Sequence, residues 1–322
     1  MKKKVLNIAA LMVAAIFVLS CCGEGDSTEK KGASHPFPKV YPPAMLGDSP
    51  AAAIYVAERF WNPFIDSSAV FSKDTSLIGG VSRDDFARAF SEYASILSYI
   101  PIADGLKAQS NFISRLIALQ RNDSTNTVFR PALELTERVF YGVNSELRNE
   151  ELYLPIASAM AECTLADEAT RGRYAFEAAN CSKNRIGAVA ADFNYTTSEG
   201  VRSSLHRTPG ENTIIFFSNP GCTACKEIIE ALGQSLTIQK LLDEGKLTII
   251  NLYIDEDLAE WHNHMGFYPK EWISCYNHDM EIREGGIYDI RAIPTLYLLD
   301  REKRVLLKDC TIQPLLHHLA AK

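Results

Sequence analysis

The chain has 322 residues, of which 47% are apolar and 23% are charged. This composition allows two ordinary domains, each with its own core, and gives no indication of a disordered or fibrous protein. The formal net charge is -7. Because nucleic-acid binding needs a basic surface, no nucleic-acid partner is expected for a chain of this acidity.

The first twenty residues have the pattern of an export signal. Three lysines precede an apolar run over residues 5–19, which is too short for a stable transmembrane anchor. The Ser20-Cys21 step that follows resembles the lipobox of bacterial lipoproteins. This implies removal of residues 1–20 as a signal peptide and lipidation of Cys21, with Cys22 as the alternative acceptor. A protein anchored in this way stays on a membrane surface. We expect it in the cell envelope, on the periplasmic or outer-membrane side.

Two regions of different character follow the signal. Residues 21–50 are rich in Gly, Pro, Ser and charged side chains and are predicted to form a partly extended tether. Residues 51–184 have the apolar spacing of helices, and the segment from Ser82 to Asp85 resembles a capping box before the clearest one. Further helices are expected near residues 110–120, 127–141, 146–162 and 167–181. This region is predicted to be an all-helical domain of unknown function, with its aromatic side chains in the core.

The period of the apolar residues changes after residue 185. Strands are expected over residues 191–195, 213–217, 247–254, 295–299 and 304–307. Helices are expected over residues 224–233, 257–265 and 312–320, and a further helix follows the first one and ends at residue 243. Alternation of strands and helices is typical of a sheet with helices on its faces. Residues 185–322 are therefore predicted to be an α/β domain.

The motif Cys222-Thr223-Ala224-Cys225 follows the most apolar predicted strand and begins a predicted helix. At a helix N-terminus, unpaired backbone N–H groups and the helix dipole stabilise a thiolate. A second cysteine one turn later can attack the mixed disulfide that the first one forms. The spacing therefore predicts dithiol exchange, with Cys222 as the nucleophile and Cys225 as the resolving thiol.

Zinc binding is an alternative use of the same cysteine spacing. It needs a second pair of ligands, and the candidates in this chain are scattered: His262, His264, Cys275 and His278. We therefore expect no metal site and no other cofactor.

A proline downstream of the dithiol supports the same chemistry. Pro294 stands directly before a predicted strand. Together with the dithiol, this segment resembles the TlpA/ResA-like exported branch of the thioredoxin superfamily, over about residues 187–322. The resemblance is carried by Gly187 with Ala191-Asp192-Phe193, by Asn219-Pro220-Gly221-Cys222 and by Ile293-Pro294-Thr295.

The resemblance implies a thioredoxin-like domain with a central mixed sheet. It also implies that Pro294 is cis and lies against the dithiol, and that the Ile293 backbone binds an extended substrate as an added strand. An ordinary trans proline in a turn is the alternative. The expected fold class is thus an N-terminal all-helical domain followed by a thioredoxin-like α/β domain.

The chain departs from that family at several positions. The Trp that often precedes the first cysteine is absent, and Ala224 replaces the Pro that often precedes the second. The entering strand has no acidic residue, where many thioredoxins keep a buried carboxylate. Peroxide-reducing relatives carry Thr or Ser at the position of Asn219, which argues against peroxide as the substrate.

The helical region also has a familiar pattern. With Glu58-Arg59-Phe60-Trp61 and Lys183-Asn184-Arg185-Ile186-Gly187, it resembles an uncharacterised domain that precedes thioredoxin-like domains in Gram-negative lipoproteins. That resemblance implies an architecture and no activity.

We therefore expect a lipid-anchored thiol-disulfide oxidoreductase that exchanges dithiols and disulfides with exported proteins. Family resemblance favours reduction, with recycling by an unidentified redox partner. The alternative is a non-enzymatic lipoprotein that binds a partner and uses the thioredoxin fold as a scaffold. The remaining cysteines of the folded part, Cys163, Cys181, Cys275 and Cys310, are either buried free thiols or disulfides, and the sequence leaves both open.

Overall fold

The structure is a computed structural model that describes residues 34–65 and 73–321. The predicted signal peptide, residues 1–20, and the predicted lipidation site Cys21 lie outside these residues. Within the two described ranges, none of the helices combines the length and the apolar character that crossing a membrane requires. The expectation of membrane attachment therefore rests on the sequence of the first 21 residues.

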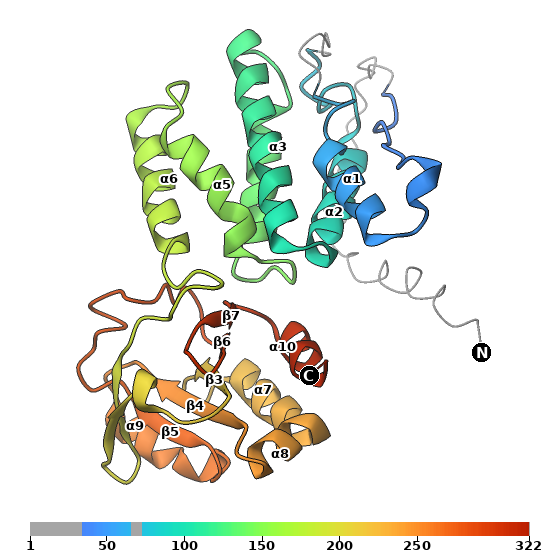
Figure 1. The fold of residues 1–322 in the computed structure, drawn as a ribbon. Helices are drawn as coiled ribbons and strands as arrows, with labels where there is room; N and C mark the ends of the chain where they lie inside the picture. Colours follow the sequence, from blue (N-terminus) through green and yellow to red (C-terminus); the bar gives the residue numbers. More distant parts are fainter. Residues whose placement is uncertain (1–33, 66–72, 322) are drawn as a thin grey trace, which may run out of the picture. The chain divides into compact units, whose positions relative to one another are not determined.

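The N-terminal part of the described chain is helical (Figure 1). Its elements are η1 (Ala44–Leu46), α1 (Pro50–Arg59), α2 (Arg83–Tyr99), α3 (Ile102–Asn122), α4 (Phe129–Thr136), the π-helix η2 (Glu137–Tyr141), α5 (Glu150–Ala161) and α6 (Glu168–Cys181). The predicted cap of α2 is confirmed, because the N–H of Asp85 donates to the hydroxyl of Ser82 at 3.1 Å. Asn149 and Asp167 cap α5 and α6 in the same way.

Aromatic side chains fill the core of this helical region. Trp61 follows α1 and is 3% exposed. Its ring centroid lies 4.6 Å from that of Phe112 on α3 and 5.4 Å from that of Tyr93 on α2. Such ring pairs add to the stabilisation that burial of their apolar area gives. The prediction that aromatic residues of this region form its core is confirmed for Trp61, Phe64, Phe140 and Tyr153, whereas Tyr99 and Phe176 are exposed.

Part of the predicted tether packs against this core. The ring centroid of Phe37 lies 4.8 Å from that of Phe64, and the N–H of His35 donates to the carbonyl of Gly80 at 3.0 Å. Burying a phenylalanine ring stabilises this arrangement more than a free chain would. The structure thus differs from the predicted tether of residues 21–50, because the chain follows the helices from His35 onward.

The C-terminal part of the chain forms one seven-stranded mixed sheet. Its strands are β1 (Asn194–Thr197), β2 (Arg202–Ser204), β3 (Asn212–Phe217), β4 (Leu247–Tyr253), β5 (Ile273–Tyr276), β6 (Thr295–Leu299) and β7 (Val305–Leu307), in the spatial order β2-β1-β5-β4-β3-β6-β7. The central strand β3 pairs in parallel with β4 and antiparallel with β6. The predicted fold class is therefore confirmed, although β2 and β5 were not predicted.

Helices cover one face of this sheet. They are α7 (Thr223–Gln234), α8 (Leu236–Asp243) and α10 (Ile312–Ala320), which lie together in Figure 1. Phe216 of β3 packs with Leu232 of α7 on this face, whereas Phe217 belongs to the core on the other face. Because neighbouring side chains of a strand point to opposite faces, both faces of β3 are buried. This explains the unbroken apolar run before the dithiol.

Short elements complete this part of the chain. They are η3 (Leu205–Arg207), α9 (Leu258–Asn263) and η4 (Met265–Phe267). The indole of Trp261 on α9 stacks against the ring of Tyr253 at the end of β4, at 6.4 Å between centroids. The segment that begins at α9 is thereby fixed beside the carboxyl end of the sheet, next to the dithiol.

Candidate active site at the end of strand β3

Strand β3 leads directly to the predicted nucleophile. All six residues of β3 are buried, and the chain then turns at Gly221, whose φ of 70° would strain a residue with a side chain. Cys222 follows as the N-cap of α7, and its Sγ accepts a hydrogen bond from the N–H of Cys225 at 3.2 Å. The structure therefore places a half-buried thiol at the N-terminus of a twelve-residue helix, where a negative charge is favoured.

The second thiol has a different environment. Cys225 lies in the first turn of α7 and is 2% exposed. Burial, followed by the hydrogen bond to Cys222, raises the pKa of the Cys225 thiol to about 12. This thiol stays protonated at neutral pH and is shielded from reagents in solution. The two cysteines thus differ in the way that a nucleophile and a resolving thiol differ.

Three polar side chains that were not predicted as site residues are Ser218 after β3, Asn251 on β4 and Tyr268 after η4. The hydroxyl of Ser218 donates to the side-chain oxygen of Asn251 on β4, and both side chains are buried. Tyr268 lines the same hollow as Cys222 and Cys225, and burial raises the pKa of its hydroxyl. These groups are neutral, in agreement with the lack of an acidic residue on the entering strand. The signal for them was Asn251, which interrupts the apolar run of β4.

A hollow of about 320 Å³ opens beside Cys222. One wall is α7, which contributes Ile229, and the other is the segment after α9, which contributes Phe267 and Tyr268. Phe267 is 75% exposed. A large apolar side chain is thus exposed beside the half-buried thiol of Cys222.

The predicted cis peptide bond between Ile293 and Pro294 is confirmed. Strand β6 begins at the next residue, Thr295, which is the partner of Phe217 at the end of β3. The proline loop and the turn that leads to Cys222 therefore lie at the same edge of the sheet. Cys222 and Ile293 also pack against the same hydrophobic core. The lining of the hollow beside Cys222 does not include Ile293 or Pro294.

The described cysteines are all free thiols. Cys163, Cys181 and Cys275 are buried, and Cys310 is partly buried. The structure therefore has the free-thiol alternative, not the disulfide one. In residues 34–65 and 73–321, no group of three or more His, Cys, Asp or Glu side chains is arranged to hold a metal ion. His264, a scattered zinc candidate, instead lines the hollow beside Cys222.

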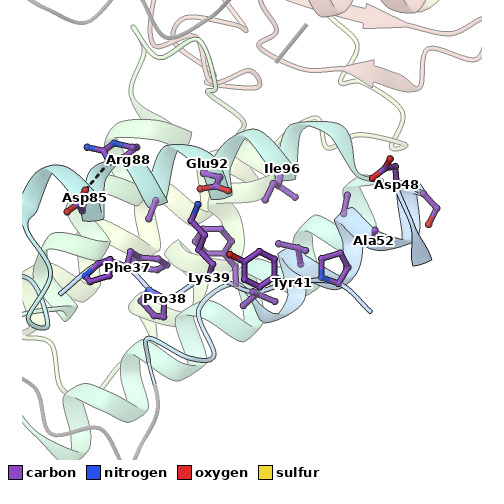
Figure 2. Close-up of a pocket in the computed structure, with 18 of the residues that line it drawn as sticks. Phe37, Pro38, Lys39, Tyr41, Asp48, Ala52, Asp85, Arg88, Glu92 and Ile96 are labelled. Atoms are coloured by element: carbon purple, nitrogen blue, oxygen red, sulfur yellow. Dashed lines mark hydrogen bonds and ion pairs between the residues drawn. The ribbon is translucent and has the colours of Figure 1, made fainter. Parts of the chain in front are cut away.

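A second hollow, of about 680 Å³, lies in the helical region between residues 36–42, α1 and α2 (Figure 2). Asp85 and Arg88 form an ion pair on the α2 side of it, at 2.9 Å. Its lining is mostly apolar and includes no cysteine. This hollow has room for a ligand but its lining supplies no thiol, so the candidate redox chemistry lies at Cys222.

Comparison with known proteins finds a family match for the helical part and a similar structure for most of the chain. Residues 20–184, just over half of the chain, match a family described as a domain of unknown function, DUF5106. The structure is similar to the crystal structure of a thioredoxin-like protein from Bacteroides caccae, with a TM-score of 0.74 and 32% sequence identity over 88% of this chain and 98% of that one. No curated protein matches this chain.

Two further solved structures match less than half of this chain. The C-terminal domain of an uncharacterized protein from Bacteroides fragilis is 45% identical, over 43% of this chain and 99% of that one, with a TM-score of 0.42. The thioredoxin domain of a thiol-disulfide oxidoreductase from Bacteroides vulgatus is 20% identical, over 42% of this chain and 96% of that one, with a TM-score of 0.38. From the DUF5106 match and the likeness to the Bacteroides caccae protein over most of both chains, this chain belongs to the DUF5106 family and is a thioredoxin-like protein.

Proposed function

We propose that this protein is a thiol-disulfide oxidoreductase that reduces disulfides in exported proteins through Cys222 and Cys225. The observation that carries the proposal is the contrast between the two thiols. Cys222 is half-buried and caps the N-terminus of α7, whereas Cys225 is 2% exposed and burial raises its pKa. A static pair of buried cysteines would not need this difference in access.

The proposed reaction follows from the positions of the two sulfur atoms. The Cys222 thiolate attacks one sulfur of a substrate disulfide, a mixed disulfide forms, and the other substrate sulfur leaves as a thiolate. Cys225 then loses its proton and attacks the sulfur of Cys222. The second substrate thiolate leaves, two electrons have passed to the substrate, and the protein holds a Cys222–Cys225 disulfide. A dithiol reductant has to return the pair to the reduced state.

Substrate binding is proposed at the edge of the sheet beside the dithiol. The backbone of Ile293, next to the cis Pro294, offers hydrogen-bonding groups to an extended polypeptide, as an added strand does. We further propose that residues 1–20 direct export, that Cys21 carries the lipid and that the protein works in the cell envelope. The helical and thioredoxin-like parts are proposed to be domains that divide near residue 184, where the DUF5106 match ends.

Insulin reduction with dithiothreitol as the recycling dithiol tests the proposal. Cys222→Ser should lower the rate to that of dithiothreitol alone, because no nucleophile remains, and reduced Cys225→Ser, freed of dithiothreitol, should trap a mixed disulfide with insulin. Cys275→Ser is the matched control, since Cys275 is a free, fully buried thiol on β5 in the same sheet. Full activity of Cys222→Ser would reject the enzyme and leave the thioredoxin fold as the scaffold of a binding protein.

A further inference from the structure

The loop that leads to Pro294 is fixed by contacts with the helical region. Arg291 precedes Pro294 by three residues, and its side chain is 14% exposed. Its guanidinium lies 2.9 Å from Glu150 at the start of α5 and donates to the backbone carbonyl of Tyr141 at the end of η2. It also stacks over the Tyr141 ring, at 4.0 Å from the ring centroid. A single side chain thus connects the proline loop to two helical elements.

The partner of Arg291 is itself held from a second direction. The carboxylate of Glu150 is 2% exposed and lies 2.7 Å from the Nζ of Lys308, which follows β7. Lys308 also donates to the carbonyl of Cys181, at the end of α6. A buried carboxylate that lost either cation would keep an uncompensated charge away from water, which is strongly unfavourable. Glu150 therefore connects the helical region to the segment before β6, through Arg291, and to the segment after β7, through Lys308.

A second carboxylate holds the residue on the other side of Pro294. Asp309 lies 3.2 Å from Arg291, 3.3 Å from Arg148 of the helical region and 3.4 Å from the hydroxyl of Thr295. Burial raises the pKa of Asp309, and Arg148 opposes this effect. Arg291 and Thr295, on either side of the Ile293–Pro294 peptide bond, therefore both contact the carboxylate of Asp309. Arg148 of the helical region pairs with the same carboxylate.

The charges of this group balance. We call it the Arg291 cluster, and its members are Arg148, Arg291, Lys308, Glu150, Asp289 and Asp309. It has three cations and three carboxylates, and each of its ion pairs joins residues that are at most 15% exposed. Removing one member of a buried ion pair leaves the other charge uncompensated, so the loss of one side chain from this cluster disturbs the others.

We propose that the helical region holds the Ile293–Pro294 loop in the conformation that protein substrates bind, with Arg291 as the positioning residue and Glu150 as its anchor. This inference rests on the proposed function, since it assigns the helical region a role in recognising the substrate of the same dithiol. Loss of the anchor leaves the sulfur chemistry at Cys222 intact. It weakens binding of a polypeptide that has to pair with the loop.

The test compares a protein disulfide with a small one. Insulin needs the loop, whereas dithiodipyridine needs only the Cys222 thiolate. Glu150→Gln should raise the KM for insulin about tenfold, which is about 1.4 kcal/mol of lost binding, and should leave the rate with dithiodipyridine within twofold of the wild-type rate. Glu151→Gln is the matched control. Glu151 is equally buried at the next position, but its partners are Arg185 and the N–H of Ile186, which lie outside the loop.

Glu150→Gln can fail to fold, so thermal denaturation is measured beside the kinetics and Arg148→Gln serves as a second variant. Among the residues that the structure describes, Arg148 reaches the loop through its ion pair with Asp309, and a threefold rise in the KM for insulin is expected. An unchanged insulin KM in the folded variants, or an equal rise in Glu151→Gln, would overturn the inference. A wild-type protein that reacts with neither disulfide would instead refute the proposed function, and this inference with it.

Discussion

The raised pKa of Cys225 can be measured by alkylation. Burial and the neighbouring sulfur raise the pKa of Cys225 to about 12. At pH 8 roughly one Cys225 thiol in 10⁴ would be ionised, compared with about a quarter of ordinary thiols with a pKa of ~8.5. Since the thiolate is the reactive form, Cys225 should alkylate roughly 10³-fold more slowly than an ordinary thiol, before its shielding is considered. Cys222, half-buried at the helix end, should react first.

The assay is pulsed alkylation of the reduced, folded protein with iodoacetamide between pH 6 and pH 10. Trypsin leaves both cysteines in one peptide, residues 208–226, so fragment ions have to locate the label. The label should be found on Cys222 over the whole range, because every pH in it lies below the raised pKa of Cys225. Unfolding in urea should equalise the two sites. Equal labelling of Cys222 and Cys225 in the folded protein at pH 8 would refute the reasoning.

Three further predictions concern the anchor, the domains and the packing of α7. Radioactive palmitate should label the full-length protein, and Cys21→Ala should abolish the label. If Cys21→Ala keeps the label and Cys22→Ala loses it, the cleavage site lies one residue later. A fragment of residues 186–322 should unfold cooperatively in urea, because its two hydrophobic cores are made of its own residues. Its KM for insulin should be raised. Aggregation of the fragment would contradict the prediction that it folds alone. Leu232→Ala should lower the free energy of unfolding by about 2–5 kcal/mol, because Leu232 is fully buried on α7. Leu236→Ala, at a position that is 81% exposed, is the control and should change it by less than about 0.5 kcal/mol.

The sequence identified the elements whose side chains carry a strong local pattern. Strand β3 was predicted because both of its faces are buried, so its apolar residues are consecutive. Strand β5 was missed because it is four residues long and includes Ser274, and only its pairing with β4 and β1 makes it a strand. Phe37 was assigned to a tether because its neighbours are prolines, and the local composition does not show the rings against which it packs.

The Arg291 cluster shows why part of the candidate site could not be predicted. Arg291 and Glu150 are 141 residues apart in the sequence. Charged residues of these types are nearly always found at the surface, so nothing in their local pattern indicates burial. The dithiol was found because its chemistry depends on residues that are adjacent in the sequence. The support of the proline loop depends on residues that only the fold brings together.

The packing of Phe37 limits how far an anchored protein can extend from its membrane. If Cys21 carries the lipid, about 16 residues link it to Phe37, and a fully extended chain of that length spans about 55 Å. A tether to residue 50 would have spanned about 100 Å. The linker that the packing of Phe37 leaves is about half as long, which would keep an anchored protein closer to the membrane surface. Disulfides in proteins that emerge from, or are held at, the same membrane would be within its reach.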